Sequence, residues 1–115
     1  MASTQQLDVT LLNGYLEALD LAILQQMLEL YMQQSALYLT IIATAVAAGD
    51  QQAWQDQCHK MKGSAASAGL CQVQQKLSEI EKSTEDWPIK AEHLCELTEL
   101  NEQAIEAFKY WLAKQ

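Results

Sequence analysis

Apolar residues recur every three or four positions along most of this chain, which is the spacing of one face of an α-helix. Asp8, Asp20 and Asp50 stand where helix N-caps are favoured, and Gly49 suits the left-handed residue that ends a helix. Pro88 disfavours helix at the residue before it, so residues 83–87 are expected to form a loop. The pattern therefore predicts five helices, over residues 9–19, 21–48, 51–68, 70–82 and 89–112.

The connections between the four longer helices are short, so we expect an all-α fold: an antiparallel four-helix bundle with a short extra N-terminal helix. Ile23, Leu30, Leu37 and Ile41 widen the apolar arc of the helix over residues 21–48, which predicts burial on more than one side. The length of 115 residues fits a single domain over residues 1–115. Residues 1–7 are expected to be disordered or to derive from an expression vector.

Composition narrows the functional classes. Acidic residues outnumber basic ones 15 to 7, and the formal net charge is −8. Nucleic acids and anionic membranes attract positive faces, so neither is expected as a partner. Three cysteines without paired spacing favour a reducing compartment, and we expect a cytoplasmic protein or the cytoplasmic portion of a membrane-bound one. No signal peptide and no apolar run long enough to cross a membrane is recognisable in the sequence.

One segment of the helix over residues 51–68 differs from the pattern expected of a bundle core: Cys58-His59-Lys60-Met61-Lys62-Gly63-Ser64-Ala65. On a helical wheel the buried side is defined by Trp54, Cys58, Met61, Ala65 and Ala68. His59 lies about 140° from Trp54, on the exposed face. Within roughly 40° of it lie Gln52, Gly63 and Ala66. Lys62 lies about 60° to one side, within reach of a group attached to the imidazole.

Gly63 is unusual, because a glycine inside an exposed helix costs roughly 1 kcal/mol relative to alanine. Gly63 lies one turn from His59 and has no side chain that could cover the imidazole. An unperturbed imidazole is largely neutral and nucleophilic at pH 7. The pattern predicts a histidine that another protein can reach, beside lysines that can partly neutralise an anion.

The run from His59 to Ala65, followed by Gly69-Leu70, resembles the H-x-x-K-G-[SA]-A…G motif of histidine-containing phosphotransfer (HPt) domains. These domains are the four-helix carriers of two-component, multi-step bacterial phosphorelays. The resemblance covers nearly the whole chain. The ending, residues 111–115, resembles HPt domains at the C-termini of hybrid sensor histidine kinases.

The resemblance implies that His59 accepts a phosphoryl group from an aspartyl phosphate on a hybrid kinase's receiver domain and passes it to a response regulator. Lys62 would help to balance the phosphoryl charge, and Gly63 would leave room for the receiver. The surface bound by receivers would include Gln52, Gln55, Lys60, Ser64 and Ala66. The chain would be a monomeric carrier without autokinase activity and without a metal or cofactor of its own, since the receiver domain brings the Mg²⁺.

One position departs from the family. Some members place a glutamine on the following helix beside the histidine, and the matching position here is Glu81 or Glu79. A carboxylate at that position would repel a phosphoryl group unless it points away.

Other interpretations stay open, although a small helical enzyme has no acid–base pair or nucleophile–base arrangement in the sequence to support it. A non-catalytic helical interaction or regulatory module would bind a partner through the wide stripe of residues 21–48, with His59 as an incidental surface residue. A metal site has little support, because the histidines and cysteines show no C-x-x-C or H-x-x-x-H spacing. His93 is expected at the edge of the core, about 40° from the apolar line of the last helix.

Overall fold

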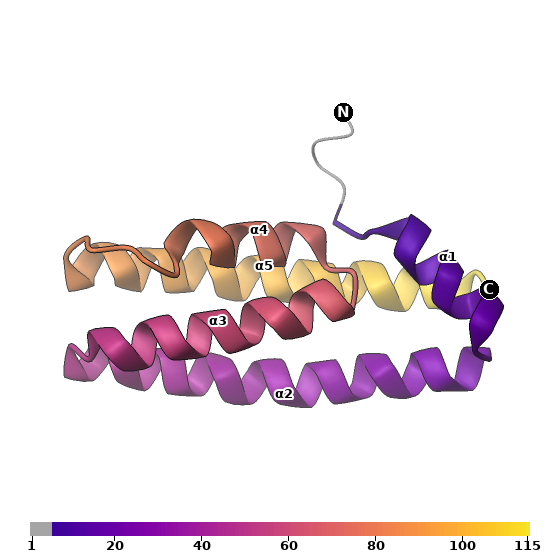
Figure 1. The fold of residues 1–115 in the computed structure, drawn as a ribbon, viewed down its shortest axis with the longest axis horizontal. Coiled ribbons are helices and arrows are strands. Elements are labelled where there is room, and N and C mark those ends of the chain that lie inside the picture. Colours follow the sequence, from indigo (N-terminus) through magenta and orange to yellow (C-terminus); the bar gives the residue numbers. More distant parts are fainter. Residues whose placement is uncertain (1–5) are drawn as a thin grey trace.

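The computed structural model describes residues 6–115 and contains five helices in that range. They are α1 (Val9–Ala18), α2 (Leu21–Ala48), α3 (Gln51–Ser67), α4 (Cys71–Ile80) and α5 (Trp87–Ala113). In Figure 1, α2 to α5 alternate in direction along the long axis of the molecule. Each packs against the next in chain order, and α5 returns to α2. The expected antiparallel four-helix bundle is confirmed.

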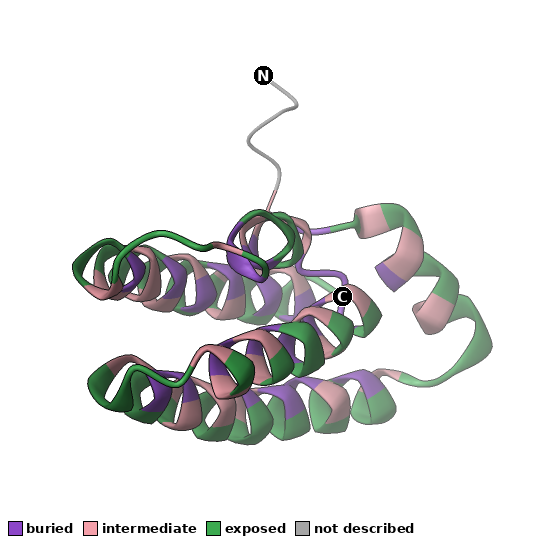
Figure 2. Cartoon of the chain, turned by 60° about the vertical axis from the view of Figure 1, so that its left-hand side comes forward, coloured by how far each residue is buried: buried purple, intermediate pink, exposed green. Residues whose placement is uncertain are grey.

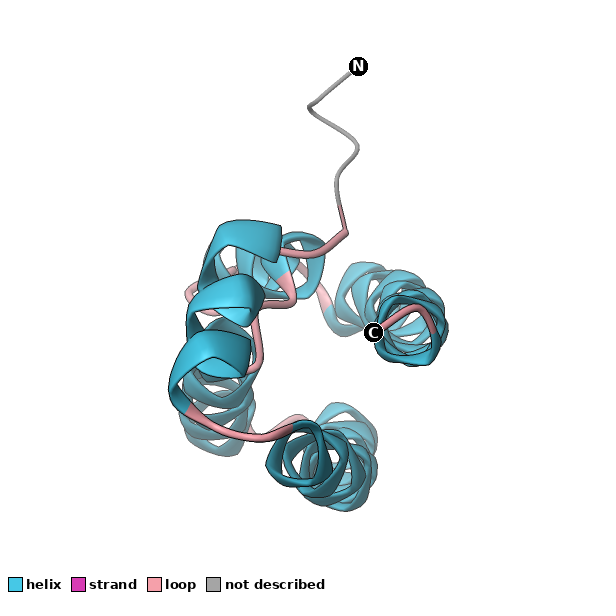
Figure 3. Cartoon of the chain, turned by 90° about the vertical axis from the view of Figure 1, so that its right-hand side faces the viewer, coloured by secondary structure: helices cyan, strands magenta, loops and turns pink. Residues whose placement is uncertain are grey.

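The first helix lies across one end of the bundle (Figure 3). There α2 and α5, with 28 and 27 residues, extend beyond α3 and α4, which have 17 and 10 residues. Leu12 of α1 is fully buried. The short N-terminal helix therefore covers apolar surface that the two shorter helices do not reach.

The expected caps start the first three helices. The carboxylates of Asp8, Asp20 and Asp50 each accept the backbone N–H three residues later at 3.0 Å. Gly49 ends α2 with φ 67° and ψ 35°, the left-handed conformation that glycine adopts without steric cost. These local signals fix the turn between α2 and α3.

The junction between α3 and α4 differs from the expectation. It is a short extended segment in which Leu70 forms an isolated antiparallel bridge with Leu7. The N–H of Asp8 also donates to the carbonyl of Gly69 at 2.8 Å. Leu7 is buried, so the expectation that residues 1–7 stand outside the fold is wrong for Gln6 and Leu7. The rest of that expectation, residues 1–5, lies outside the described residues.

The fifth helix begins at Trp87, two residues earlier than expected. Pro88 sits in its first turn, where the missing N–H breaks no helical hydrogen bond. The ring of Trp87 packs edge-on against that of Trp54, with centroids 6.3 Å apart. This tertiary contact favours a helical Trp87 although the residue precedes a proline.

The buried residues, purple in Figure 2, lie mainly on the inner sides of the helices, and α2 contributes Leu24, Leu28 and Ile42 to them. Burial of α2 on more than one side was expected, and this is wrong for three of the four residues that widen the arc, whereas Ile41 is partly buried. Ile23, Leu30 and Leu37 are 38%, 54% and 59% exposed, because α3 and α5 cover only the inner arc of the helix. We call these three residues the α2 stripe.

By length and composition alone, α2 could also cross a membrane, since its most apolar window has a mean hydropathy of 1.2. In the structure it forms one side of the bundle, and its inner face contacts α3 and α5. An apolar helix in a bundle core passes the same test.

A buried polar network links α2 to α5. The hydroxyl of Tyr31 donates to Asn101 Oδ1 at 2.6 Å, and Asn101 Nδ2 donates to Ser35 Oγ at 3.1 Å. All three residues are at most 3% exposed. Burial raises the pKa of the Tyr31 phenol well above its ordinary value, so the hydroxyl stays protonated and can donate.

Replacing Asn101 with leucine should destabilise the bundle by about 2 kcal/mol, because it leaves the Tyr31 hydroxyl buried without an acceptor. The double variant Tyr31→Phe/Asn101→Leu should recover part of that loss, since both polar partners are then gone. Urea denaturation followed by far-UV circular dichroism measures both effects. A double variant as unstable as the sum of the two single variants would contradict the role given to this network.

Candidate functional site

The middle of α3 presents His59 to solvent. The opposite side of the helix is the buried side expected from the sequence, comprising Trp54, Cys58, Met61, Ala65 and Ala68. The imidazole of His59 is 69% exposed. The helical-wheel assignment of this helix is therefore confirmed.

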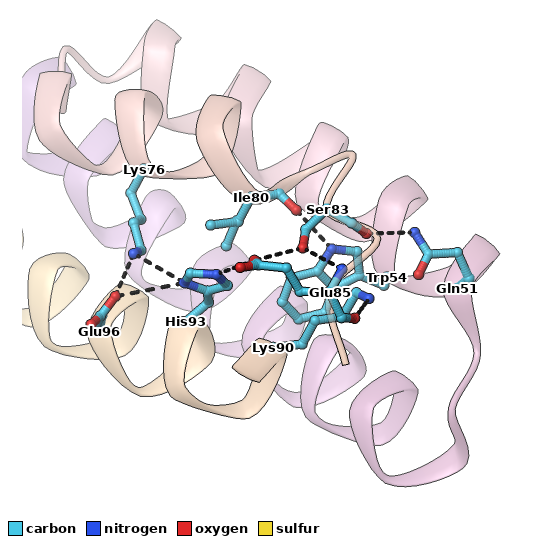
Figure 4. Close-up of polar contacts among 9 residues, drawn as sticks. All are labelled: Gln51, Trp54, Lys76, Ile80, Ser83, Glu85, Lys90, His93 and Glu96. Carbon is cyan, nitrogen blue, oxygen red and sulfur yellow. Dashed lines mark hydrogen bonds and ion pairs between the residues drawn. The ribbon is translucent and has the colours of Figure 1, made fainter. Parts of the chain in front are cut away.

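The loop after α4 is held against α3 by two hydrogen bonds, drawn in Figure 4. The indole Nε1 of Trp54 donates to the carbonyl of Ile80 at 2.9 Å, and Gln51 Nε2 donates to the carbonyl of Ser83 at 3.1 Å. Trp54 is fully buried, so its position is fixed by the core. These bonds place the end of α4, where Glu81 stands, beside α3.

The same loop is joined to α5 by a polar cluster (Figure 4). His93 Nε2 lies 2.7 Å from Glu85 Oε1, and Lys76 Nζ contacts both His93 Nδ1, at 3.4 Å, and Glu96. The side chain of His93 is 24% exposed, which places it at the edge of the core as expected. The cluster links α4, and the loop that follows Glu81, to α5.

Glu81 is the nearest charged partner of His59. Its Oε2 lies 3.2 Å from His59 Nδ1, and its Oε1 lies 2.7 Å from Lys62 Nζ. The Glu81 side chain is only 10% exposed, and that of Lys62 is 27% exposed. The ammonium of Lys62 holds the pKa of Glu81 below its ordinary value, with a smaller contribution from His59 and opposition from burial. The carboxylate is therefore ionised at neutral pH.

This geometry decides between the two candidate carboxylates. Glu79 is exposed, and its carboxylate accepts a hydrogen bond from Gln75 on the same helix. Glu81 points toward the imidazole and not away from it, and its charge is balanced by Lys62. Sequence reasoning placed Lys62 beside His59 but did not foresee that Glu81 would engage both residues.

The surface around His59 is open. A Cβ on Gly63 would meet no atom within 4 Å. Of the residues expected to form the binding surface, Gln52 and Lys60 are exposed, whereas Gln55, Ser64 and Ala66 are partly exposed. All five lie on α3 with His59, but the amide of Gln52 is engaged by Asp56 at 2.9 Å.

A groove between α2 and α3 adjoins this surface. Its volume is about 350 Å³, and its lining comprises Met27, Leu30, Tyr31, Gln34, Gly63, Ser64, Ser67 and Ala68. The contribution of α2 was not predicted, because Leu30 was expected on a buried arc and Met27 was given no role. Their spacing alone does not distinguish a buried face from an exposed apolar one.

The three cysteines occupy different environments. Cys58 is buried, Cys71 is partly exposed, and Cys95 is exposed on α5. Burial raises the pKa of the Cys58 thiol to about 12, and the charge of Glu81 adds to the shift. Across residues 6–115 the structure has no cluster of three or more histidine, cysteine or acidic side chains that could hold a metal ion.

An exposed histidine near a lysine and an open glycine, on one helix of a four-helix bundle, is the arrangement that the resemblance in the sequence implied. The profile of the Hpt domain family matches residues 26–107, and the chain belongs to that family. A solved structure described as the histidine-containing phosphotransfer domain of ArcB from Escherichia coli superposes with a TM-score of 0.85. It is 27% identical in sequence, and the match covers 99% of this chain and 98% of that one.

Two full-length proteins show the same likeness. The chain is 28% identical over 112 residues to the aerobic respiration control sensor protein ArcB of Escherichia coli K12, and equally to that of Shigella flexneri. Each match covers 94% of this chain but 14% of the relative. This chain is a phosphohistidine carrier of the kind used in two-component phosphorelays, and carriers of this family transfer phosphoryl groups without being catalysts themselves.

The ion pair at Glu81 should make stability depend on pH in a defined way. A carboxylate with a lowered pKa in the fold stabilises it above the ordinary value of 4.5, and this contribution is lost as pH falls through the folded value. Glu81→Gln should therefore cost about 1 kcal/mol at pH 7. The cost should shrink as the pH falls below about 4, because the parental carboxylate is then protonated as well.

Urea denaturation of both proteins across this pH range tests the expectation. Glu79→Gln removes an equal charge from an exposed site and serves as the control. A cost for Glu81→Gln that is the same at neutral and acid pH would rule out the ion pair as its cause.

Proposed function

We propose that His59 is the residue that carries the phosphoryl group. The observation that carries this proposal is the exposed imidazole held at Nδ1 by Glu81, one turn from the open surface at Gly63. The phosphoryl donor is an aspartyl phosphate on a receiver domain, and the next acceptor is the aspartate of a response regulator. Both transfers take place at Nε2, because Nδ1 faces Glu81.

The charges around His59 suit a transient phosphoryl group. Lys62 lies one turn from His59 and partly reaches solvent, so its ammonium can balance the negative charge that arrives with the phosphoryl group. Lys60, which follows His59 in the sequence, is exposed. The Mg²⁺ that phosphoryl transfer requires is supplied by the receiver domain, and the carrier contributes no metal or cofactor of its own.

The receiver is proposed to cover the exposed face of α3 and the adjoining groove. Gln52, Gln55, Lys60, Ser64 and Ala66 form the part on α3. Leu30, which lines the groove, and Leu37 of the α2 stripe extend it with exposed apolar surface. An apolar patch with a polar rim is the usual composition of a protein-binding surface.

The matched relatives are sensor proteins, and the chain spans 14% of their length. We propose that it acts in the same setting, as the phosphotransfer domain of a hybrid sensor histidine kinase, located in the cytoplasm. Its partners are then the receiver domain of that kinase and a separate response regulator. A monomeric carrier fits this role, because each transfer needs one free histidine face.

Incubation with a phosphorylated receiver domain should transfer label to the parent protein, and the label should be acid-labile and base-stable. His59→Gln should abolish that label, because the amide has no nucleophilic ring nitrogen. His93→Gln, which replaces the other histidine, should be labelled like the parent. Labelling that survives in His59→Gln would refute the assignment.

Gly63→Leu should slow transfer by a factor of about 100, because a branched side chain would stand where the receiver must approach His59. The fold should persist, since a Cβ on Gly63 meets no neighbour within 4 Å. Gly14→Leu is the matched control: Gly14 is also helical with open space around it, but it lies on α1. Far-UV circular dichroism and transfer rates compare the variants, and parental transfer by Gly63→Leu would show that this surface is not covered.

A further inference from the structure

A hollow surface on α5 lies outside the proposed receiver site. Two grooves of about 690 and 310 Å³ adjoin there and share Gln6, Ala107 and Tyr110 in their linings. Tyr110 is 65% exposed, which is more than any residue of the α2 stripe. The ammonium of Lys114 lies 4.5 Å from the centroid of the Tyr110 ring. We call the two grooves together the α5 groove.

The two parts of the α5 groove differ in chemistry. The lining of the smaller part includes Leu7, Val9 and Trp111, so an apolar side chain can enter it. The larger part has carboxylates at its side, from Glu102 and Glu106. An apolar hollow with a polar edge is the composition of a protein-binding surface.

The two glutamates belong to a longer row of acidic residues, which we call the α5 acidic stripe. Its members are exposed and follow one another at intervals of three or four residues: Glu92, Glu96, Glu99, Glu102 and Glu106. On a helical wheel all five lie within about 60° of one direction. The buried residues of α5, such as Leu97 and Phe108, lie on the opposite side. The stripe therefore faces away from the bundle core.

The charge of the stripe is only partly compensated within the chain. Glu96 pairs with Lys76, and Glu106 pairs with Lys109 at 3.4 Å. The other three members of the stripe have no ion pair within residues 6–115. Like charges three or four residues apart repel one another and destabilise a helix. The stripe therefore costs α5 some stability and retains negative charge that a positively charged partner can neutralise.

The shape and charge of this surface narrow the class of partner. Within the described part of the chain, no group of three acidic, histidine or cysteine side chains could hold a metal ion. Nucleic acids and anionic membranes are themselves negative and would be repelled. The stripe extends over about 21 Å of helix. A second helix lying alongside would present its own side chains at the same spacing.

We propose that the α5 groove and the α5 acidic stripe form a docking surface for a basic helical segment of a partner protein. Lysine or arginine side chains of that segment lie along the stripe, and an apolar side chain enters the groove beside Tyr110. The interaction uses none of the residues to which phosphoryl transfer has been assigned. The inference therefore goes beyond the proposed function and does not depend on it.

This docking surface and the histidine face lie on different sides of the bundle. The helices α3 and α5 each pack against α2 and α4, so they occupy diagonal positions. The imidazole of His59 is exposed on α3, whereas the stripe faces outward from α5. A partner held on α5 leaves His59 accessible, so a receiver domain can exchange phosphoryl groups while that partner stays bound.

Backbone amide chemical shifts of the nitrogen-15-labelled protein test the proposal with a synthetic peptide. The probe is an alanine-based peptide of about 16 residues, a length at which helix formation becomes favourable, with lysines at intervals of three and four and one leucine near its end. It should shift the resonances of residues 92–111 and leave those around His59 unchanged. Its affinity should fall as salt is added, because exposed charges are screened. The same peptide with glutamate in place of lysine should not bind.

Variants separate the stripe from the net charge of the protein. Glu99→Lys/Glu102→Lys should weaken peptide binding about tenfold. Glu17→Lys/Asp56→Lys changes the net charge by the same amount at exposed sites on α1 and α3, and it should stay within about twofold of the parent. Tyr110→Ala should weaken binding about fivefold, because it removes the aromatic side of the groove. Far-UV circular dichroism checks that each variant is folded.

Shifts confined to the α2 stripe or to α3 would overturn the proposal, and so would an equal loss of affinity in the two charge-reversal variants. Parental affinity in Tyr110→Ala would overturn the part given to the groove. Transfer from a phosphorylated receiver to His59 should proceed in saturating peptide at the rate measured without it, and a peptide that blocks transfer would overturn the separation of the two surfaces. A parent protein that takes no label even without peptide would instead overturn the proposed function, while the shifts would still decide the docking surface.

Discussion

The hydrogen bond from the indole of Trp54 to the carbonyl of Ile80 joins a fully buried residue of α3 to the last turn of α4. The residue after Ile80 is Glu81, so this bond sets the distance between the carboxylate and the imidazole. A buried donor left without its acceptor would be costly, which keeps the two helices in register. The relative position of Glu81 and His59 at the surface thus depends on a hydrogen bond in the core that involves neither residue.

Most of the fold could be predicted from local sequence signals. Three aspartate caps and Gly49 act through bonds within a few residues, so the bounds of α2 and the start of α3 could be predicted. The buried and exposed sides of α3 could be predicted as well, because its apolar and polar residues lie on distinct faces. The features that escaped prediction are tertiary: the pairing of Leu7 with Leu70 and the early start of α5 at Trp87 depend on contacts between distant segments.

The candidate site could be predicted in part. The exposure of His59 and the open space at Gly63 follow from helical periodicity on one element. The orientation of Glu81 does not, because it depends on how the end of α4 meets α3. The α2 stripe was misassigned for a related reason: an apolar residue on a wide arc can face the core or a partner, and the sequence pattern is the same in both cases.

The distribution of the cysteines has a practical consequence. Cys58 is buried with a strongly raised pKa, and burial raises the pKa of Cys71 as well, whereas Cys95 is exposed on α5. Thiol reagents act on the thiolate, so they favour an accessible sulfur. Since α5 packs against α2 and α4, a dye or a surface linker on Cys95 would be attached away from α3. The unaltered chain thus offers a place for a fluorescent reporter of partner binding that leaves the histidine face free.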